Sequence, residues 1–424
     1  MFRKIIVLLL ALALLLPTVG LASAAEPVTI TFWDENAGPM RTPLYDKMIA
    51  DFEAANPDIK VEYVGIPWAS AKEKYDLAID SNTMPDCADV PQAWLSNYVL
   101  KEVLEPLDAY FEAWDKKDTQ ISGFLDANRK IVPDGKLYGL VNISNMTGIW
   151  YRPDLFAEKG IGVPQTWDDF FAAVEETTDV ANGMYGFSLR GGAGSSTLLQ
   201  EMLYSYSGIK DFFDENGKST INNLDHLDFL KKFVGMYKVY TAESDINNGY
   251  KEMVAAFDTG AAAMILHNLG SYGEHMDTLG EGKFAFTTFP ASKQGYRNLF
   301  STHNGYSIFA NSDKKDAAWR FISFLCEAEQ VSYWNENVGA IPPNTVSMES
   351  DWAKNTPHIQ VVAEAFADPE TSIISAPFNL PTYADVHNNI LGPALQEVLI
   401  GAKTPEAFLE LWETEMNAAY ESAQ

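Results

Sequence analysis

The stretch VTITFWDENAGPMRTPLYDKMIADFEAANPDIKVEY, residues 28–63, carries the pattern that decides the fold. Its first six residues read as a strand, and Leu44, Met48 and Phe52 then recur at helical spacing until Pro57 ends the run. The last five residues alternate apolar and polar side chains, as a half-buried strand does. This order of strand, helix and strand predicts two parallel strands joined by a right-handed crossover.

The same alternation continues along the chain. We expect a helix near residues 69–81, a short buried strand at 86–90, and a helix from 91 to about 100. A chain that alternates strands and helices in this way is typical of the α/β class. Its 424 residues exceed what one hydrophobic core normally serves, so at least two domains are predicted.

The N-terminus has the composition of an export signal. Arg3 and Lys4 precede an apolar run over residues 5–16, and small residues follow up to Ala24. This run is shorter than the ~20 apolar residues that a membrane-spanning helix needs, so residues 1–24 are predicted to be a cleaved signal peptide. The expected location is the periplasm or the extracellular space.

The two cysteines, Cys87 and Cys326, bear on anchoring and on redox state. Neither stands at the cleavage site, so no acceptor for a lipid anchor is found there, and the mature chain is expected to be soluble. Both lie among apolar neighbours, which favours free buried thiols. A long-range disulfide between them is the alternative.

The charge balance restricts the partners. With 58 acidic and 30 basic side chains the formal charge is −28, which would repel nucleic acid and anionic lipid. No nucleic-acid partner is therefore expected. Neutral or cationic small ligands remain.

Local catalytic motifs are missing from the sequence. The segment 217–219, Gly-Lys-Ser, lacks the upstream glycine of a phosphate loop, because Phe212 holds that position. The six histidines show no spacing suited to a metal, so neither a metal nor a cofactor is predicted. A pair of glycosidase carboxylates could still hide among the many acids, since such pairs share geometry rather than spacing. The glycine-rich loop 190–196 could hold an anion through its backbone N–H groups, with an ordinary flexible loop as the alternative.

Several segments together resemble the extracellular solute-binding proteins of ABC sugar importers, the family typified by maltose-binding protein. The similarity extends over the whole predicted mature chain, and the order and spacing of the segments carry it. These segments are FEAANPDIKV (52–61), MPD (84–86), LEPLD (104–108), WYRPDLF (150–156), VPQTWDDF (163–170) and AFDTGAAAM (256–264).

The resemblance implies a fold and a function. The fold is the type II periplasmic-binding-protein fold, an α/β architecture of two lobes, each a sheet flanked by helices, joined by a multi-strand hinge. The rhythm of the segments places one lobe at 27–137 plus 262–312 and the other at 138–261 plus 313–424. The implied function is that of a monomer that captures a mono- or oligosaccharide between its lobes, without chemistry. It would deliver the sugar to the permease subunits of an ABC importer, and the ATPase of that importer would be an indirect partner. A binder of a phosphorylated polyol and a glycan-cleaving enzyme are the alternatives.

Residues just after predicted strands are the first candidates for the site, because open α/β sheets bind ligands beyond the carboxyl ends of their strands. Trp33, Asp34 and Glu35 follow the first strand, and Gln92 and Trp94 follow the short buried strand. A sugar offers C–H faces to aromatic rings and hydroxyls to donors and acceptors, which these residue types supply. For Trp33, a place in the core is the alternative.

The resemblance adds ten candidates from later segments. Asn145 takes the position where the maltose-type pattern carries a ligand-binding acid, which leaves the exact ligand open. Arg190 and Gly191 match a loop that touches ligand, although a surface arginine is the alternative. Tyr272 stands near the usual Gly-x-Trp segment after a one-residue shift, and for residues 301–305 a turn is the alternative. The other candidates are His267, Asn268, His303, Asn304, Tyr383 and His387.

Overall fold

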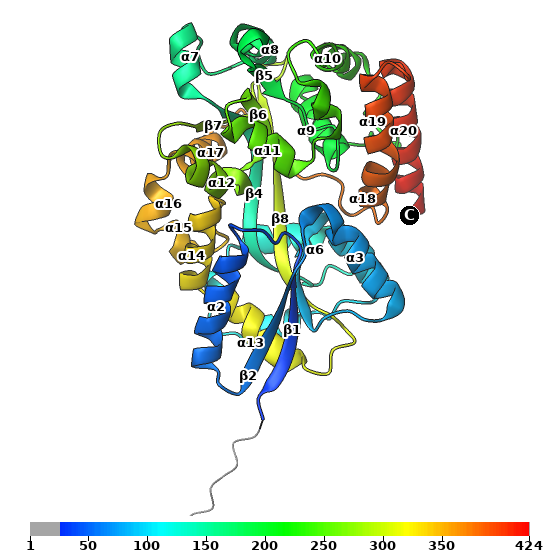
Figure 1. The fold of residues 1–424 in the computed structure, drawn as a ribbon. Coiled ribbons are helices and arrows are strands. Elements are labelled where there is room, and N and C mark those ends of the chain that lie inside the picture. The colour runs from blue at the N-terminus through cyan, green and yellow to red at the C-terminus, as the bar shows by residue number, and fades with distance from the viewer. Residues whose placement is uncertain (1–25, 424) are drawn as a thin grey trace, which may run out of the picture.

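Two long strands, β4 (Leu140–Tyr151) and β8 (Arg297–Ile308), run through the middle of the molecule and connect its two lobes (Figure 1). The computed structural model describes residues 26–423. The predicted signal peptide, residues 1–24, lies outside the described residues.

The first lobe is built on the strands that the opening segment predicts. β1 (Val28–Asp34) pairs in parallel with β2 (Ile59–Gly65) and with β3 (Cys87–Pro91), and β3 pairs antiparallel with the last part of β8. The predicted strand, helix, strand unit is therefore confirmed. The helices of this lobe are α2 (Thr42–Ala55), α3 (Trp68–Ser81), α4 (Gln92–Leu100), α5 (Asp108–Ala113) and α6 (Ser122–Lys130), with α13 (Lys315–Leu325) and α14 (Ala328–Val338).

The second lobe forms where β4 and β8 separate and take new partners. Residues 140–146 of β4 pair with β8, whereas residues 147–151 pair with β6 (Ala262–Asn268). β6 pairs in parallel with β5 (Tyr185–Ser188), while β7 (Ala285–Thr288) joins β4 and β9 (Thr371–Ile374) joins the start of β8. The helices on this side are α7 (Pro153–Lys159), α8 (Trp167–Thr177), α9 (Ser195–Ser207), α10 (Leu224–Gly235), α11 (Tyr250–Asp258), α12 (Tyr272–Leu279), α17 (Pro357–Ala367), α18 (Tyr383–Asp385), α19 (Gly392–Leu399) and α20 (Pro405–Ser422), and the short α15 (Thr345–Met348) and α16 (Asp351–Asn355) precede α17.

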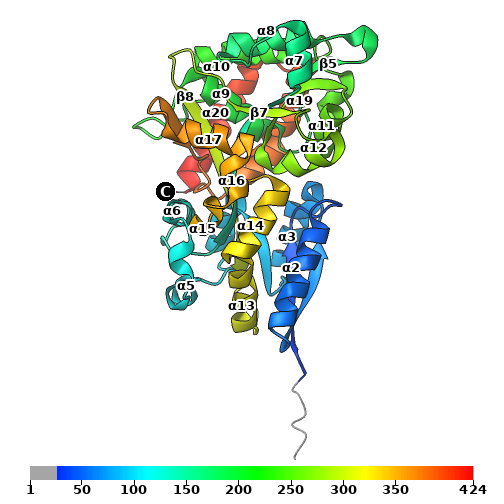
Figure 2. The ribbon, with the colours of Figure 1, turned by 90° about the vertical axis from the view of Figure 1, so that its left-hand side faces the viewer.

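The expected division of the chain between the lobes differs from these pairings in two places. Residues 262–300, expected in the first lobe, form β6, α12, β7 and the part of β8 that pairs with β9. Residues 315–338, expected in the second lobe, form α13 and α14, which contact α2, β1 and β4 (Figure 2). Helical periodicity identifies such segments as helices, but it carries no information on which sheet they cover.

Local signals at helix ends are confirmed. Thr166 caps α8 in a capping box, accepting from the backbone N–H of Asp169, whose side chain accepts from the N–H of Thr166. Thr404 caps α20, and Pro405 opens it. Both cysteines are free and buried.

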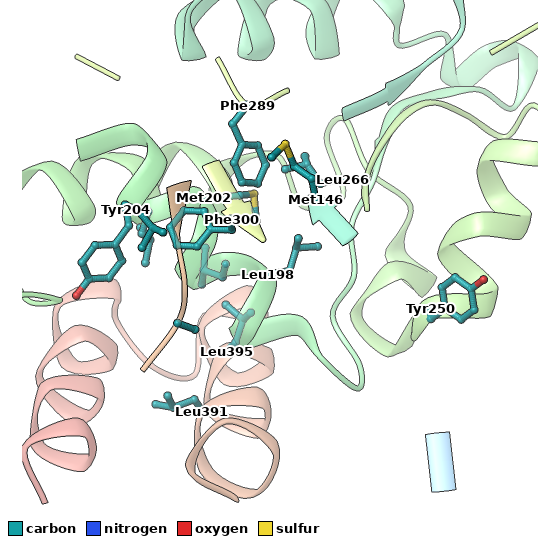
Figure 3. Packing of buried hydrophobic residues seen from close by; sticks show 14 of the residues in the cluster. Met146, Leu198, Met202, Tyr204, Tyr250, Leu266, Phe289, Phe300, Leu391 and Leu395 are labelled. Atoms are coloured by element: carbon teal, nitrogen blue, oxygen red, sulfur yellow. The ribbon is translucent and has the colours of Figure 1, made fainter. Parts of the chain in front are cut away.

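The buried apolar side chains form two clusters, one centred in the second lobe and one within the first lobe. In the second lobe, Figure 3 shows Met146 of β4 and Leu266 of β6 near Phe289, while Leu198 of α9 lies near Leu395 of α19. α9 is buried over nearly its whole length, with Leu199, Leu203 and Ser205 at 0% exposure. The first-lobe cluster gathers side chains from β1, α2 and α13. The larger cluster also takes in Tyr75 of α3 and Trp94 of α4, so apolar packing runs from the second lobe into the helices of the first.

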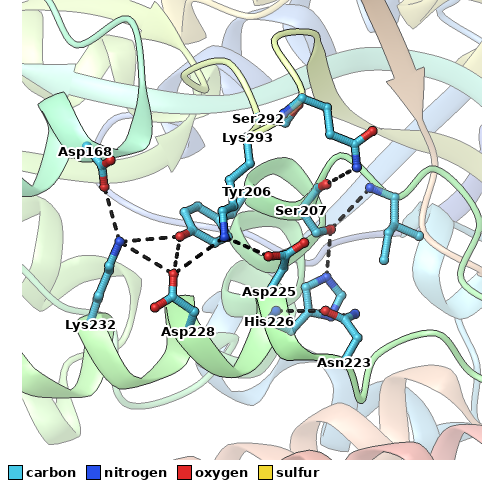
Figure 4. A network of polar contacts seen from close by, with 12 residues as sticks. Asp168, Tyr206, Ser207, Asn223, Asp225, His226, Asp228, Lys232, Ser292 and Lys293 are labelled. Atoms are coloured by element: carbon cyan, nitrogen blue, oxygen red, sulfur yellow. Dashed lines mark hydrogen bonds and ion pairs between the residues drawn. The ribbon is translucent and has the colours of Figure 1, made fainter.

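A polar network ties α9 and α10 together at a distance from that interface (Figure 4). Lys232 of α10 donates to Asp168 and to the hydroxyl of Tyr206, which in turn donates to Asp228. His226 contacts the Oγ of Ser207 through Nε2 at 2.9 Å, and burial lowers its pKa to about 4. This network is satisfied internally, so we assign it to the packing of the second lobe.

No helix among residues 26–423 is both long enough and apolar enough to cross a bilayer.

Candidate functional site

A cavity of about 880 Å³ lies between the lobes, where β4 and β8 exchange partners. Asn145 and Thr147 of β4 and Thr302, His303 and Asn304 of β8 line it. The strands part at this point because their pairing changes, so side chains that would otherwise meet within one sheet face an open space. Burial lowers the pKa of His303 to about 4, which makes its imidazole neutral.

The first lobe contributes side chains that follow β1 and β3, as the sequence predicts. Glu35 accepts from Asn304 Nδ2 through Oε1 at 2.7 Å, and its Oε2 is buried without a partner. Gln92 accepts from the backbone N–H of His303 at 3.3 Å, and its Nε2 has no partner. Arg41 lies beside them and donates to the carbonyl of Gly270 across the interface at 3.4 Å. Buried polar groups of this kind are costly unless something bonds to them, so they point to a polar ligand.

The glycine-rich loop after β5 forms part of the opposite wall. Gly191 approaches the backbone of residues 245–248 so closely that a Cβ would lie 2.5 Å from the carbonyl oxygen of Ile246. The loop is fastened by backbone hydrogen bonds from Gly191 to Asp245 O (3.0 Å) and from Gly192 to Asn248 O (2.8 Å). This close approach explains the run of glycines. The loop is held in place and aims the side chain of Arg190 at the cavity.

Arg190 and Glu201 give this wall its charge. Arg190 donates from Nε to the carbonyl of Ala193 at 2.6 Å, and burial lowers its pKa to about 10. Glu201 of α9 is 6% exposed with its Oε2 unpartnered, and burial raises its pKa to about 7. Tyr250 and His267 stack at 4.8 Å beside them.

The third part of the wall is an irregular helical segment. α18 continues into a π-helical turn, η5 (Val386–Leu391), before α19 begins. π-Helical turns are rare and often occur at functional sites. His387 contacts Ser196 Oγ at 2.9 Å through Nδ1 and leaves Nε2 unpartnered, while Tyr383 donates to Gln200 at 2.5 Å. Asn388 and Asn389 also line the cavity.

The electrostatics favour neutral hydrogen-bonding partners. Burial, together with the carboxyl groups of Asp89 and Asp34, raises the pKa of Glu35 well above its usual value. Burial and the charge of Arg190 lower the pKa of His267 well below its usual value. Protonated carboxyl groups and neutral imidazoles both donate and accept hydrogen bonds, which is the pattern that a hydroxyl group matches.

Most of the residues predicted from the sequence come together here. The predicted residues that line the cavity are Glu35, Gln92, Trp94, Asn145, Arg190, Gly191, His267, Asn268, His303, Asn304, Tyr383 and His387.

Trp33, Asp34 and Tyr272 are not among the lining residues. Trp33 packs edge-on against Tyr75 of α3, with ring centroids 5.4 Å apart. Asp34 accepts from the Tyr63 hydroxyl at 2.7 Å, so it braces β1 against β2. The ring of Tyr272 lies 4.3 Å from that of His358, between α12 and α17. All three side chains contact other residues of the protein. They are therefore packed within a lobe and do not face the cavity as predicted.

Many lining residues were missed by sequence reasoning, among them Arg41, Trp68, Thr147, Glu201 and Tyr250. Trp68 begins the helix after β2, so the strand-end rule that selected Gln92 would also have selected it. Glu201 and Tyr250 lie on helices, and no local pattern marks them. Within residues 26–423, no cluster of three His, Cys, Asp or Glu side chains is arranged to hold a metal ion.

A ligand-sized cavity between two α/β lobes that share long strands defines a two-lobed binding protein. The match to a family model over residues 47–361 makes the assignment specific: the chain belongs to the family of bacterial extracellular solute-binding proteins. The resemblance noted in the sequence is thereby confirmed.

Individual relatives agree with this assignment. A putative binding protein of Brucella abortus is 24% identical over 400 residues, which cover 93% of this chain and 94% of that protein. The mannitol-binding protein of Pseudomonas aeruginosa is 27% identical over 342 residues, or 77% of this chain and 75% of that one. An ABC transporter solute-binding protein of Thermotoga lettingae, solved with α-D-tagatose, superimposes with a TM-score of 0.82 at 20% identity, covering 93% and 100% of the two chains.

Proposed function

We propose that this protein captures a carbohydrate between its lobes and presents it, chemically unchanged, to the permease subunits of an ABC importer. The observation that carries the proposal is the set of buried, unpartnered polar atoms that both lobes aim at one cavity. They include acceptors on Glu35 and Asn145 and a donor on Gln92. A sugar hydroxyl donates and accepts, so it can satisfy such a mixed set. The mannitol and tagatose named for two relatives are ligands of this chemical kind.

Capture would work by closure about the two strands that change partners. Ligand that contacts both lobes favours the closed form, and the permease would then recognise that form. Contacts with one lobe alone would not shift the equilibrium. We place the protein outside the cytoplasm as a monomer, freed from its signal peptide.

A thermal-shift screen against sugars, polyols and their phosphates tests the proposal. Ligand at a hundred times its Kd stabilises the folded state by about 2.7 kcal/mol, which for a 424-residue chain raises the Tm by roughly 3 °C. Gln92→Ala in the first lobe and Asn145→Ala in the crossing strand should both abolish the shift. The exposed Gln360→Ala on α17 serves as the control. If every carbohydrate leaves the Tm unchanged, the proposal is wrong.

A phosphorylated polyol is the second candidate, because the hydrogen bonds of Arg41 and Arg190 go only to backbone carbonyls of the described residues. Glu35 lies near Arg41 and Glu201 near Arg190, but within the described residues neither guanidinium group donates a hydrogen bond to a carboxylate, so each keeps donors that an anion could use. The phosphate arm of the screen separates the two candidates. Arg190→Met would abolish binding of a phosphate ester and weaken that of a neutral sugar far less.

An assay for reducing ends tests whether the protein cleaves its ligand. Incubation with oligosaccharides should release no new reducing ends. A time-dependent increase that Glu201→Gln removes would instead indicate a glycan-cleaving enzyme.

A further inference from the structure

The cavity extends well beyond the charged residues at its inner end. One face of α3 lines it from the first turn to the last, through Trp68, Lys72, Asp76 and Asp80. Twelve residues of α-helix span about 18 Å at the standard rise per residue. The cavity is therefore an extended groove at this side, and α3 forms one of its walls over the whole length of the helix.

The facing wall has a similar extent. Lining residues recur from Tyr383 in α18 through η5 to Gln396 in α19. The two walls are held together by Lys72 Nζ and Asp385 Oδ1 at 3.6 Å, and by Asn97, which donates to the carbonyl of Pro381 at 3.1 Å. In Figure 1, α18 lies directly above α3. The groove is thus bounded by both lobes, like the inner end of the cavity.

An aromatic platform lies at the start of this groove. The ring of Trp68 stacks on that of Trp94 at 5.7 Å with an interplanar angle of 15°. Trp94 is in turn held edge-on by Tyr75. Trp68 is only partly buried and lines the cavity, so this supported indole can offer a flat face to a ligand. Flat indole faces of this kind pack well against apolar faces, and the C–H face of a sugar ring is one.

The inner end of the cavity is different in character. Glu35, Arg41, Arg190 and Glu201 line it, and they offer hydrogen bonds. A pyranose ring measures roughly 6 Å across with bonds of ~1.5 Å, so one ring cannot fill a groove of this length. The volume of about 880 Å³ is also near the upper end of the ~300–1,000 Å³ typical of ligand pockets.

We propose that the ligand is an oligosaccharide of at least two linked rings, one held by the inner polar residues and a second stacked on Trp68. The inference rests on the proposed carbohydrate function and adds the minimum length of the substrate. Trp68 then acts as a specificity residue for length, because only the second ring reaches it.

Isothermal titration calorimetry with matched series tests the length. The probes are glucose, maltose and maltotriose; glucose, cellobiose and cellotriose; and xylose, xylobiose and xylotriose. In the series that binds, the two-ring sugar should bind at least ten-fold tighter than the single ring, as expected for one added stacking contact. Trp68→Ala should remove this gain and change the affinity for the single ring by less than about two-fold.

Two further variants separate stacking from folding. Trp68→Phe keeps a flat ring and should retain part of the gain, whereas Trp352→Ala, at a partly buried tryptophan of α16 outside the cavity, should leave all affinities unchanged. Equal affinity for one and two rings, or an equal loss for both in Trp68→Ala, would overturn this inference and leave the carbohydrate function intact. The absence of binding in every series would overturn both.

Discussion

Replacing Glu201 with glutamine should make the protein more stable at neutral pH and no more stable in acid. The carboxyl group is 6% exposed on α9, one of its oxygens has no partner, and burial raises its pKa to about 7. In the unfolded chain the same group has a pKa near 4.3. The glutamine side chain has nearly the same shape and does not ionise.

The sign follows from proton linkage. Below about pH 4 the carboxyl group is mostly protonated in the folded and in the unfolded state, so its ionisation does not lower the free energy of unfolding. Between about pH 4.3 and 7 the unfolded chain ionises first, so the free energy of unfolding of the wild type falls as pH rises. Above pH 7 the full gap between the two pKa values, about 2.7, applies, and it corresponds to roughly 3–4 kcal/mol in the free energy of unfolding. Glu201→Gln escapes this cost, so its advantage should grow over that pH range.

Urea unfolding followed by tryptophan fluorescence between pH 4 and 8.5 measures this difference. Each variant is compared with the wild type at the same pH. The contributions of the other buried acids near the cavity to the free energy of unfolding therefore cancel. Glu410→Gln, at an exposed carboxylate on α20, is the matched control and should show a flat difference. A difference between Glu201→Gln and the wild type that does not change with pH would refute the reasoning.

Three further substitutions test the site and the fold. Gly191→Ala places a Cβ 2.5 Å from Ile246 O and should weaken ligand binding more than about ten-fold in calorimetry, whereas Gly162→Ala, with open space around it, should not. Phe321→Ala empties a fully buried site in the first lobe and should cost about 3–5 kcal/mol in urea unfolding. Asp385→Asn removes an ion pair with α3 and should change the free energy between closed and open forms by less than about 1 kcal/mol. Small-angle X-ray scattering of the ligand-free protein should show the resulting shift toward the open form.

Local patterns in the sequence were sufficient to predict individual helices and strands and part of the site. The strands at 28–34 and 59–65 and the capping box at Thr166 arise from contacts within a few residues, which periodicity and cap chemistry record. The strand-end rule placed Glu35 and Gln92 at the cavity, because a parallel sheet brings the carboxyl ends of its strands to one edge.

The tertiary structure alone decided how those elements combine. β4 meets β6 across more than a hundred residues of chain, and this pairing, which no local pattern encodes, sets the lobes and opens the cavity. It also brings Glu201 to the cavity from α9 and leaves Trp33 packed against α3. The raised pKa of Glu201 has the same origin, since burial is a property of the assembled lobes and not of the residues next to it in the chain.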